Sequence, residues 1–208
     1  MAKKPATWLG SLILFCLVLA MGLGADLGSK AWVFQQYYPY YQSEQISEAD
    51  FQPHWLISEI LGIQTSTNGG ALFGMMQGFQ AVFIGLSAIA FLSVLAWLFA
   101  FRGWHDRLLV LCLGMISGGI LGNLYDRLGW WHQANTPPEA YNEVRDWIHF
   151  RLSGIPLFDP WPNFNIADSL LVVGVGIMLV QSFLAPTESQ PEKESDTETG
   201  ESSAPAEG

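Results

Sequence analysis

Charged residues are scarce in this chain of 208 residues, and basic ones are the scarcest. Only 13% of the residues are charged, with nine Lys and Arg against nineteen Asp and Glu, and the formal net charge is −10. A protein that binds nucleic acid needs a basic surface to neutralise phosphates. The composition therefore excludes nucleic acid as a partner.

The chain is also poor in residues that form disulfides or metal sites. Its two cysteines, Cys16 and Cys112, both lie inside apolar runs, where we expect small core residues. No group of His, Cys and Asp stands at metal-ligand spacing, and no Ser or Cys is accompanied by an obvious base. The sequence therefore predicts no metal and no cofactor.

What the chain does have is four long runs without any charged residue. These runs are Trp8–Ala25, Phe79–Phe101, Leu108–Tyr125 and Ser169–Ala185. Crossing the hydrocarbon layer takes about 20 apolar residues, and a buried soluble bundle would show a charged face. We therefore expect an all-α membrane protein with four transmembrane helices and small extracytoplasmic β or irregular elements. Residues 1–185 would form this membrane domain, and residues 186–208 a disordered, acidic cytoplasmic tail.

The basic residues suggest how the helices cross the membrane. Basic residues near membrane ends favour the cytoplasmic side. In a four-helix arrangement, one side carries Lys3, Lys4, Arg102 and Arg107, and the other side carries Lys30, Arg127, Arg145 and Arg151, mostly in longer loops. We therefore expect both termini in the cytoplasm and the two large loops, Lys30–Gly78 and Leu128–Asn163, outside.

Three aspartates, Asp126, Asp146 and Asp168, fall in the segment between the last two apolar runs. Carboxylates at the ends of membrane helices are costly and are functional candidates by default. Two carboxyls held close together share one proton, so one can accept a proton from water while the other donates to a peptide carbonyl. Asn123 and Asn165 could orient them without adding charge. Position alone does not decide which two aspartates form the pair, because Asp126 and Asp146 each have a neighbouring arginine.

Two further features are ambiguous in the sequence. Asp26 and Lys30 are four residues apart, so on a helix they share a face. They could form a surface salt bridge at the membrane boundary or support a nearby site. The segment Asn68–Gly74 (NGGALFG) carries paired glycines, which suit a plain turn or the close approach of another chain.

Five short motifs together resemble lipoprotein signal peptidase, also called signal peptidase II. They are D-x-x-x-K at Asp26–Lys30, N-x-G-A-x-F at Asn68–Phe73, G-N-x-x-D-R at Gly122–Arg127, V-x-D-W-I at Val144–Ile148 and F-N-x-A-D at Phe164–Asp168. They occur in the family's order, and the resemblance covers about residues 8–185.

The resemblance implies an aspartic endopeptidase of the bacterial inner membrane. Such an enzyme removes the signal peptide from prolipoproteins, cutting before a cysteine that carries diacylglycerol. It implies that Asp146 and Asp168 are the catalytic pair. The supporting or substrate-binding positions would be Asp26, Lys30, Asn68, Gly122, Asn123, Asp126, Arg127 and Asn165. We expect an active site near the outer face and a monomer whose partners are lipid-modified precursors and membrane lipid.

Two departures from the family and two rival functions accompany this interpretation. Residues Gln133–Glu143 look inserted and polar, which predicts an exposed excursion, and the acidic tail extends beyond the family's usual end.

A proton- or ion-coupled transporter could also use membrane carboxylates, but it would place them near mid-helix. A non-catalytic assembly factor would tolerate Asp-to-Asn changes.

Overall fold

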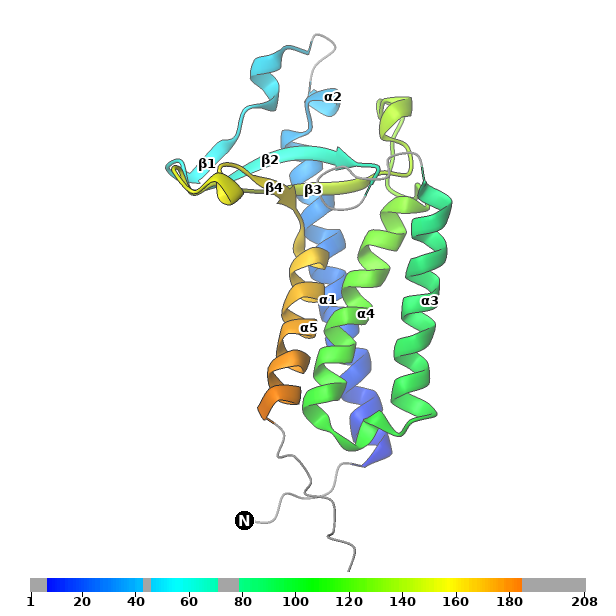
Figure 1. Ribbon diagram of the computed structural model, residues 1–208. Helices are drawn as coiled ribbons and strands as arrows, with labels where there is room; N and C mark the ends of the chain where they lie inside the picture. The colour runs from blue at the N-terminus through cyan, green and yellow to red at the C-terminus, as the bar shows by residue number, and fades with distance from the viewer. Residues whose placement is uncertain (1–6, 43–45, 71–78, 185–208) are drawn as a thin grey trace, which may run out of the picture.

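Four long apolar helices lie side by side and carry a small sheet across one end of the bundle (Figure 1). The computed structural model describes residues 7–42, 46–70 and 79–184. The helices are α1 (Trp8–Tyr37), α3 (Gln80–Phe99), α4 (Arg107–Arg127) and α5 (Ile166–Leu184), and each is long and apolar enough to cross a membrane. The predicted fold class is confirmed. The tail at 186–208 and residues Ala71–Phe73 of the second motif lie outside the described residues.

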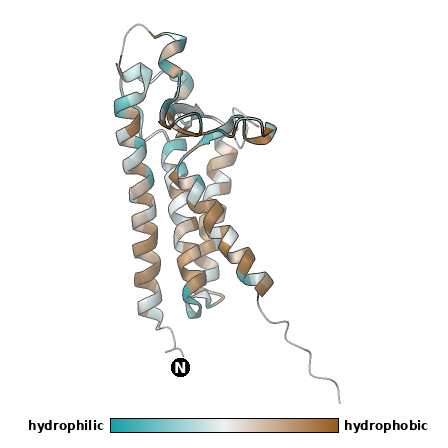
Figure 2. Cartoon of the chain, turned by 90° about the vertical axis from the view of Figure 1, so that its left-hand side faces the viewer, coloured by the Kyte–Doolittle hydropathy of each residue, from teal (hydrophilic) through white to brown (hydrophobic). Residues whose placement is uncertain are grey.

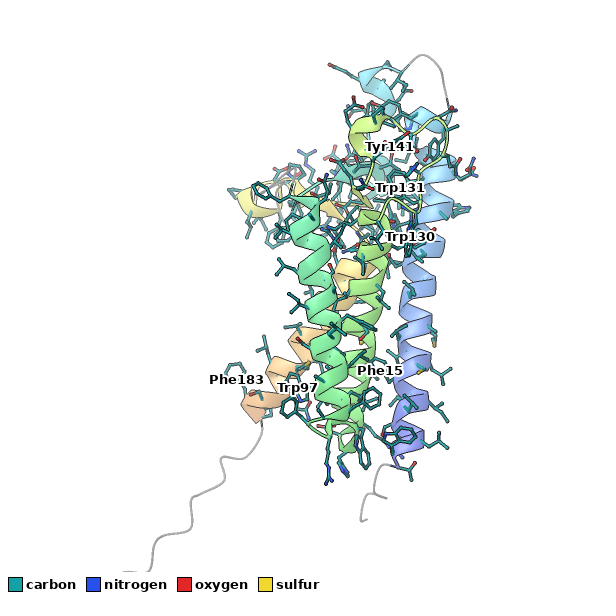
Figure 3. All side chains as sticks on the ribbon, turned by 90° about the vertical axis from the view of Figure 1, so that its right-hand side faces the viewer. Phe15, Trp97, Trp130, Trp131, Tyr141 and Phe183 are labelled. Carbon is teal, nitrogen blue, oxygen red and sulfur yellow. The ribbon has the colours of Figure 1, made fainter. Side chains whose placement is uncertain are left out.

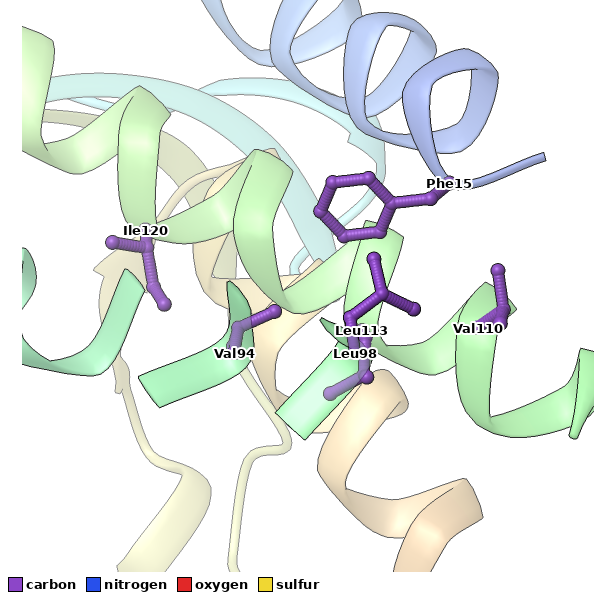
Figure 4. Packing of buried hydrophobic residues seen from close by; sticks show 6 residues of the cluster. All are labelled: Phe15, Val94, Leu98, Val110, Leu113 and Ile120. Atoms are coloured by element: carbon purple, nitrogen blue, oxygen red, sulfur yellow. The ribbon is translucent and has the colours of Figure 1, made fainter. Parts of the chain in front are cut away.

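Helix α4 is the central helix of the bundle. Its membrane window is 56% buried, against 11% for each of the other three, and it packs against α1, α3 and α5. The main core cluster lies around its first half, where Leu113 and Val110 meet Phe15 of α1 and Leu98 of α3 (Figure 4). Hydropathy colouring shows long brown stretches in the helices (Figure 2), and many of their large apolar side chains are exposed, among them Leu17, Leu92 and Val172. The apolar side chains thus face both the core and the surrounding lipid.

Helix α1 is much longer than the charge-free run that predicted it. The run ends at Ala25, but the helix continues to Tyr37. Asp26 and Lys30 are both fully buried in it, which excludes the first of the two alternatives, a surface salt bridge at the membrane boundary. Their opposite charges compensate each other inside the protein, which lets the helix continue through them.

The sheet is antiparallel throughout, with the order β1-β2-β3-β4. Its strands are β1 (His54–Ile57), β2 (Leu61–Asn68), β3 (Val144–Phe150) and β4 (Trp161–Phe164). The expected small β elements are therefore present, but they come from both large loops and join into one sheet. Ser66 of β2 pairs with Asp146 of β3, which fixes the register beside the candidate site.

Both large loops lie at the same end of the bundle as the sheet. The short connection through η3 (Gly103–His105) lies at the other end, together with the start of α1 and the end of α5 (Figure 1). Exposed tryptophans mark both ends: Trp97 lies near the η3 end and Trp130 near the sheet (Figure 3). Tryptophan at these two levels is typical of the two membrane–water boundaries.

The segment Gln133–Glu143 is not simply an exposed excursion. Its short helix η4 (Pro138–Ala140) buries Ala140 in an aromatic cluster with Phe34, Tyr38 and Trp131. The hydroxyl of Thr136, itself buried, lies 2.6 Å from that of Tyr41. Most of the segment is exposed, as predicted, and the buried Thr136 and Ala140 fix it beside the end of α1. Smaller elements complete this end of the molecule: α2 (Pro39–Gln42), η1 (Glu48–Phe51) and η5 (Pro156–Phe158).

Candidate active site

Asn165 and Asp168 form the start of α5 and bond to each other reciprocally. The Asp168 N–H donates to Asn165 Oδ1 at 2.9 Å, and the Asn165 N–H donates to Asp168 Oδ2 at 3.2 Å. This is the arrangement of a capping box, which satisfies backbone donors that a helix start leaves without partners. The spacing of Asn and Asp in the F-N-x-A-D motif therefore serves to fix the Asp168 carboxyl at a helix end.

Asp146 approaches the same asparagine from strand β3. Asn165 Nδ2 donates to Asp146 Oδ1 at 2.7 Å, and Asn68 Nδ2 at the end of β2 donates to Asp146 Oδ2 at 3.3 Å. Asp146 is only 3% exposed. Burial, followed by the neighbouring Asp168 carboxylate, raises the pKa of Asp146 well above its usual range. Asn165 thus bonds to both carboxyls and holds them at one place.

Asn123 of α4 connects this pair to a buried lysine. Its Nδ2 donates to Asp168 Oδ1 at 2.8 Å, while its Oδ1 accepts from Lys30 Nζ at 3.0 Å and from Asn165 Nδ2 at 3.1 Å. An ammonium group is only a donor, so the amide oxygen of Asn123, and not its nitrogen, must face Lys30. The amide nitrogen of Asn123 is therefore directed at Asp168.

Behind the pair lies a buried cluster of four charges from three elements. Lys30 Nζ lies 2.8 Å from Asp26 Oδ2 and 3.0 Å from Asp126 Oδ2. Arg145 Nε and Nη2 donate to Asp126 Oδ1 at 3.0 and 2.7 Å, and the Arg145 N–H donates to Asp126 Oδ2 at 3.0 Å. Two positive and two negative charges balance, which is what burial of ionised groups requires.

This cluster clamps together the elements that carry the aspartates. Asp126 joins α4 to β3 next to Asp146, and Asp26 Oδ1 accepts the N–H of Ala167 at 2.9 Å, which holds the start of α5 against α1. Gly122 makes room for it, because a Cβ there would collide with Asp26 Oδ2 and lie 3.3 Å from the Ala167 Cβ. A glycine is needed at this close approach of three helices.

Neither Asp126 nor Asp146 is paired with the arginine next to it in the sequence. Asp126 is bound by Arg145 and Lys30, whereas Arg127 Nη2 donates to Gly70 O at 3.4 Å and its guanidinium lies 5.1 Å from the centre of the Phe83 ring. Adjacent helical residues point in directions about 100° apart. Arg145 likewise turns away from Asp146, so its proximity in sequence does not commit Asp146 to a cation.

A cavity of about 540 Å³ opens in front of the two aspartates. Its polar end holds both carboxyls with Asn68, Asn123 and Arg127. Its apolar end lies between α3, α4 and α5 and is lined by Phe83, Leu86, Ala90, Ile116, Ile120, Leu171 and Val172. The carboxyls therefore stand where a polar chain segment and an apolar one could be bound side by side.

The structure brings all ten predicted site residues into one connected region. Asp146, Asp168, Asn68, Asn123 and Arg127 line the cavity, and Asn165, Gly122, Asp26, Lys30 and Asp126 lie behind it. Sequence reasoning missed the role of Arg145 as the strand-side partner of Asp126. Within residues 7–42, 46–70 and 79–184, no three His, Cys, Asp or Glu side chains gather in a way that would hold a metal ion.

Comparison with known proteins agrees with this geometry. A family model described as signal peptidase (SPase) II matches residues 18–184. A lipoprotein signal peptidase of Rhodopirellula baltica is 47% identical over 130 residues, which are 62% of this chain and 57% of that protein. A lipoprotein signal peptidase of Photorhabdus laumondii is 30% identical over 191 residues, covering 89% of this chain and 96% of that protein.

Solved structures agree on the fold. Two structures described as bacterial membrane enzymes superpose with TM-scores of 0.62 and 0.61 at 20% and 21% identity. The superpositions cover 92% and 90% of this chain and the whole of each of the other chains. With the family model matched from the middle of α1 to the end of α5, and with four helices that can cross a membrane, the chain belongs to the signal peptidase II family.

Proposed function

We propose that this protein is an aspartic endopeptidase of the membrane that removes the signal peptide from prolipoproteins. One observation carries the proposal: one residue, Asn165, donates to both carboxyls at the mouth of a largely apolar cavity, its side-chain amide to Asp146 and its backbone N–H to Asp168. Family membership and the names of the relatives support a peptidase acting on lipoprotein precursors.

The chemistry follows from the state of the pair. The raised pKa of Asp146 makes it the carboxyl that holds the shared proton, and Asp168 is the base. Asp168 takes a proton from water as the water oxygen attacks the scissile carbonyl, and Asp146 donates its proton to the carbonyl oxygen. When the tetrahedral intermediate collapses, the C–N bond breaks, the leaving amine takes the proton from Asp168, and a hydroxyl of the intermediate returns its proton to Asp146. The pair then again holds one proton.

Charge in the cavity is consistent with one proton on the pair. A singly protonated pair carries one negative charge, and Arg127 lines the same cavity with one positive charge. The cluster behind it is neutral by itself. Arg127 can also hold a substrate carbonyl or carboxylate without competing for the proton, because guanidinium has no acceptor.

The apolar end of the cavity supports a lipid-bearing substrate. Its lining comes from α3, α4 and α5, so a diacylglyceryl chain on the substrate cysteine could lie between these helices while the peptide bond reaches the aspartates. Binding energy from such a remote group helps to position the scissile bond. The aspartates lie at one end of the bundle and not at mid-helix, which argues against the transporter alternative.

The test is cleavage of a lipid-modified precursor by the purified protein in detergent, followed on a gel. Lipidated precursor should be cut before its modified cysteine, and the same precursor without diacylglycerol should give a far lower kcat/KM. Asp168→Asn is the matched inactive control, with a loss of several orders of magnitude because Asn cannot serve as base. Equal kcat/KM for the two precursors would contradict the assigned substrate class.

A further inference from the structure

Two neighbouring loops form the free end of the sheet. Residues 58–60 join β1 to β2, and the chain after β3 folds back through η5. The Arg151 N–H donates to Ile60 O at 2.9 Å, which ties the two loops together. We call Leu56–Ile60 and Ile155–Leu157 the sheet tip.

The sheet tip exposes aliphatic side chains that the described part of the chain leaves uncovered. Leu56 is 64% exposed and Leu157 59%, and the others are comparable: Ile57, Ile60 and Ile155. Leu56 and Ile57 end β1, and Ile60, Ile155 and Leu157 lie in the two adjacent loops, so five exposed aliphatic side chains gather at one end of the sheet. A contiguous apolar patch on a protein surface marks contact with another apolar phase.

The position of the sheet tip indicates which phase that is. Strand β4 ends at Phe164 and α5 begins at Ile166, so a single residue separates the sheet from a membrane-spanning helix. The strands cross the helix axes steeply, and the tip projects sideways beyond α5 (Figure 1). Four residues of β4 at about 3.3 Å each carry the chain roughly 13 Å from α5. The tip lies above the first turn of α5, at about the height of the start of the membrane-spanning helix α3, and beyond α5 it stands over lipid and not over protein (Figure 1).

The same region also carries polar side chains. Glu59, His149, Arg151 and Asp159 line a shallow hollow there, and Arg151 Nε pairs with Asp159 Oδ1 at 2.6 Å. An element with one apolar and one charged surface lies in the plane of the membrane interface and does not cross it. The interface layer is only about 5–7 Å thick on each side of the hydrocarbon, which suits short loops with aliphatic ends.

We propose that the sheet tip inserts its aliphatic side chains into the lipid headgroup layer on the active-site side of the membrane. The contact is continuous with the bilayer that surrounds α5. If the proposed function is right, this contact also helps to hold the strand that carries the catalytic Asp146. Strand β3 would be held at one end by Asp126 and at the other, where Phe150 pairs with Leu61 beside the tip, by lipid. Asp146 lies between the two attachments.

Depth-dependent quenching tests the proposal. A single cysteine replaces Ile57 or Leu157 in protein whose Cys16 and Cys112 have been replaced by Ser and Ala, and it is labelled with an environment-sensitive fluorophore. The protein is reconstituted into phosphatidylethanolamine–phosphatidylglycerol vesicles, with or without phosphatidylcholine carrying a nitroxide near its headgroup. We expect a blue-shifted emission maximum and a clear loss of emission with the nitroxide lipid at both positions.

Two matched positions calibrate the loss. Met21→Cys reports on the lipid-facing surface of α1, where Met21 is 73% exposed, and Glu139→Cys reports on the exposed η4. Quenching of both tip probes above that of Glu139→Cys supports insertion. Quenching of the tip probes equal to that of Glu139→Cys overturns the proposal. A blue shift without quenching also overturns it, because burial against a second copy of the protein would give that result. The readout does not involve cleavage, so failure of the proposed peptidase activity would leave the result interpretable.

Discussion

Replacement by Asn should affect stability differently at Asp126 and at Asp146. The two buried carboxyls differ in whether their partners are charged or neutral. Asp126 accepts two hydrogen bonds from the Arg145 guanidinium and one from the Arg145 backbone N–H, and it forms an ion pair with Lys30. Asp146 takes its hydrogen bonds from the neutral amides of Asn68 and Asn165. The first carboxylate compensates buried charge, and the second can be replaced by a neutral group.

Asp126→Asn should destabilise the protein strongly. The buried cluster changes from neutral to one uncompensated positive charge, since Lys30 and Arg145 keep only Asp26. Removing one partner of a buried ion pair costs about 3–5 kcal/mol. For a chain of this size, each kcal/mol lowers Tm by roughly 2–4 °C, so we expect a fall on the order of 10 °C, with reduced protein level and partial activity.

Asp146→Asn should abolish cleavage without destabilising the protein. The raised pKa of Asp146 means that the folded state favours the neutral carboxyl. Above the unfolded-state pKa, ionisation of this group therefore opposes folding, and stability falls as pH rises towards the folded-state pKa. Asn removes that penalty and keeps the shape. We expect an unchanged or higher Tm near neutral pH and a loss of activity of several orders of magnitude.

The assay uses the buried thiol of Cys112 as a reporter of unfolding. In a Cys16→Ser background, a thiol-reactive dye gains fluorescence when heating exposes Cys112, which is fully buried in the folded protein. Cleavage of lipidated precursor is measured on the same samples. The reasoning would be refuted if Asp146→Asn lost as much Tm as Asp126→Asn. Near-normal turnover by Asp146→Asn, with none from a well-folded Asp126→Asn, would replace the assigned pair by Asp126 and Asp168.

Three further predictions follow from the site and its surroundings. Gly122→Ala should lower Tm, by about 1–3 kcal/mol of overpacking, because its Cβ meets a buried carboxylate; Gly24→Ala, with nothing within 4 Å, is the control and should be neutral or stabilising. As pH rises, kcat/KM should fall only at alkaline pH, where Asp146 loses its proton, because the pKa of Asp146 is raised; a loss of activity that begins as pH rises above about 4 would exclude this. Cysteines placed in Leu128–Asn163 should react with an impermeant reagent on intact cells and those in Arg102–Arg107 should not, and the reverse pattern would invert the topology.

Much of the fold could be predicted because a helix that crosses lipid needs a long run of residues without charge. Runs without charge had to be spans, and the span positions agree with α3, α4 and α5 to within a few residues. The end of α1 was missed because charge was taken as the end of a span. Asp26 and Lys30 neutralise each other and are buried, so their charges do not mark the membrane boundary.

The sheet and the ion pairs were harder to predict. Strand β3 reads VRDWIHF, and its charged residues made it look like part of a loop; two of them, Arg145 and Asp146, are in fact buried by partners on other elements. The pairing of Arg145 with Asp126 depends on how β3 meets the end of α4, which no spacing rule encodes. Sequence adjacency suggested Arg127 instead, and helix geometry directs that side chain into the cavity.

The buried charge cluster also has a consequence for how the chain matures. Asp26 and Lys30 are synthesised long before Asp126 and Arg145, and only the later pair gives Lys30 its second carboxylate. Until α4 and β3 have been made, Lys30 has only Asp26, and the start of α5 lacks its partner on α1. A chain interrupted after α3 would have α1 and α3 in the bilayer. Lys30 of α1 would then lack its acceptors on α4. Completion of the catalytic region and completion of assembly are thus one event, so an incompletely made protein lacks the arrangement that could cut a peptide bond.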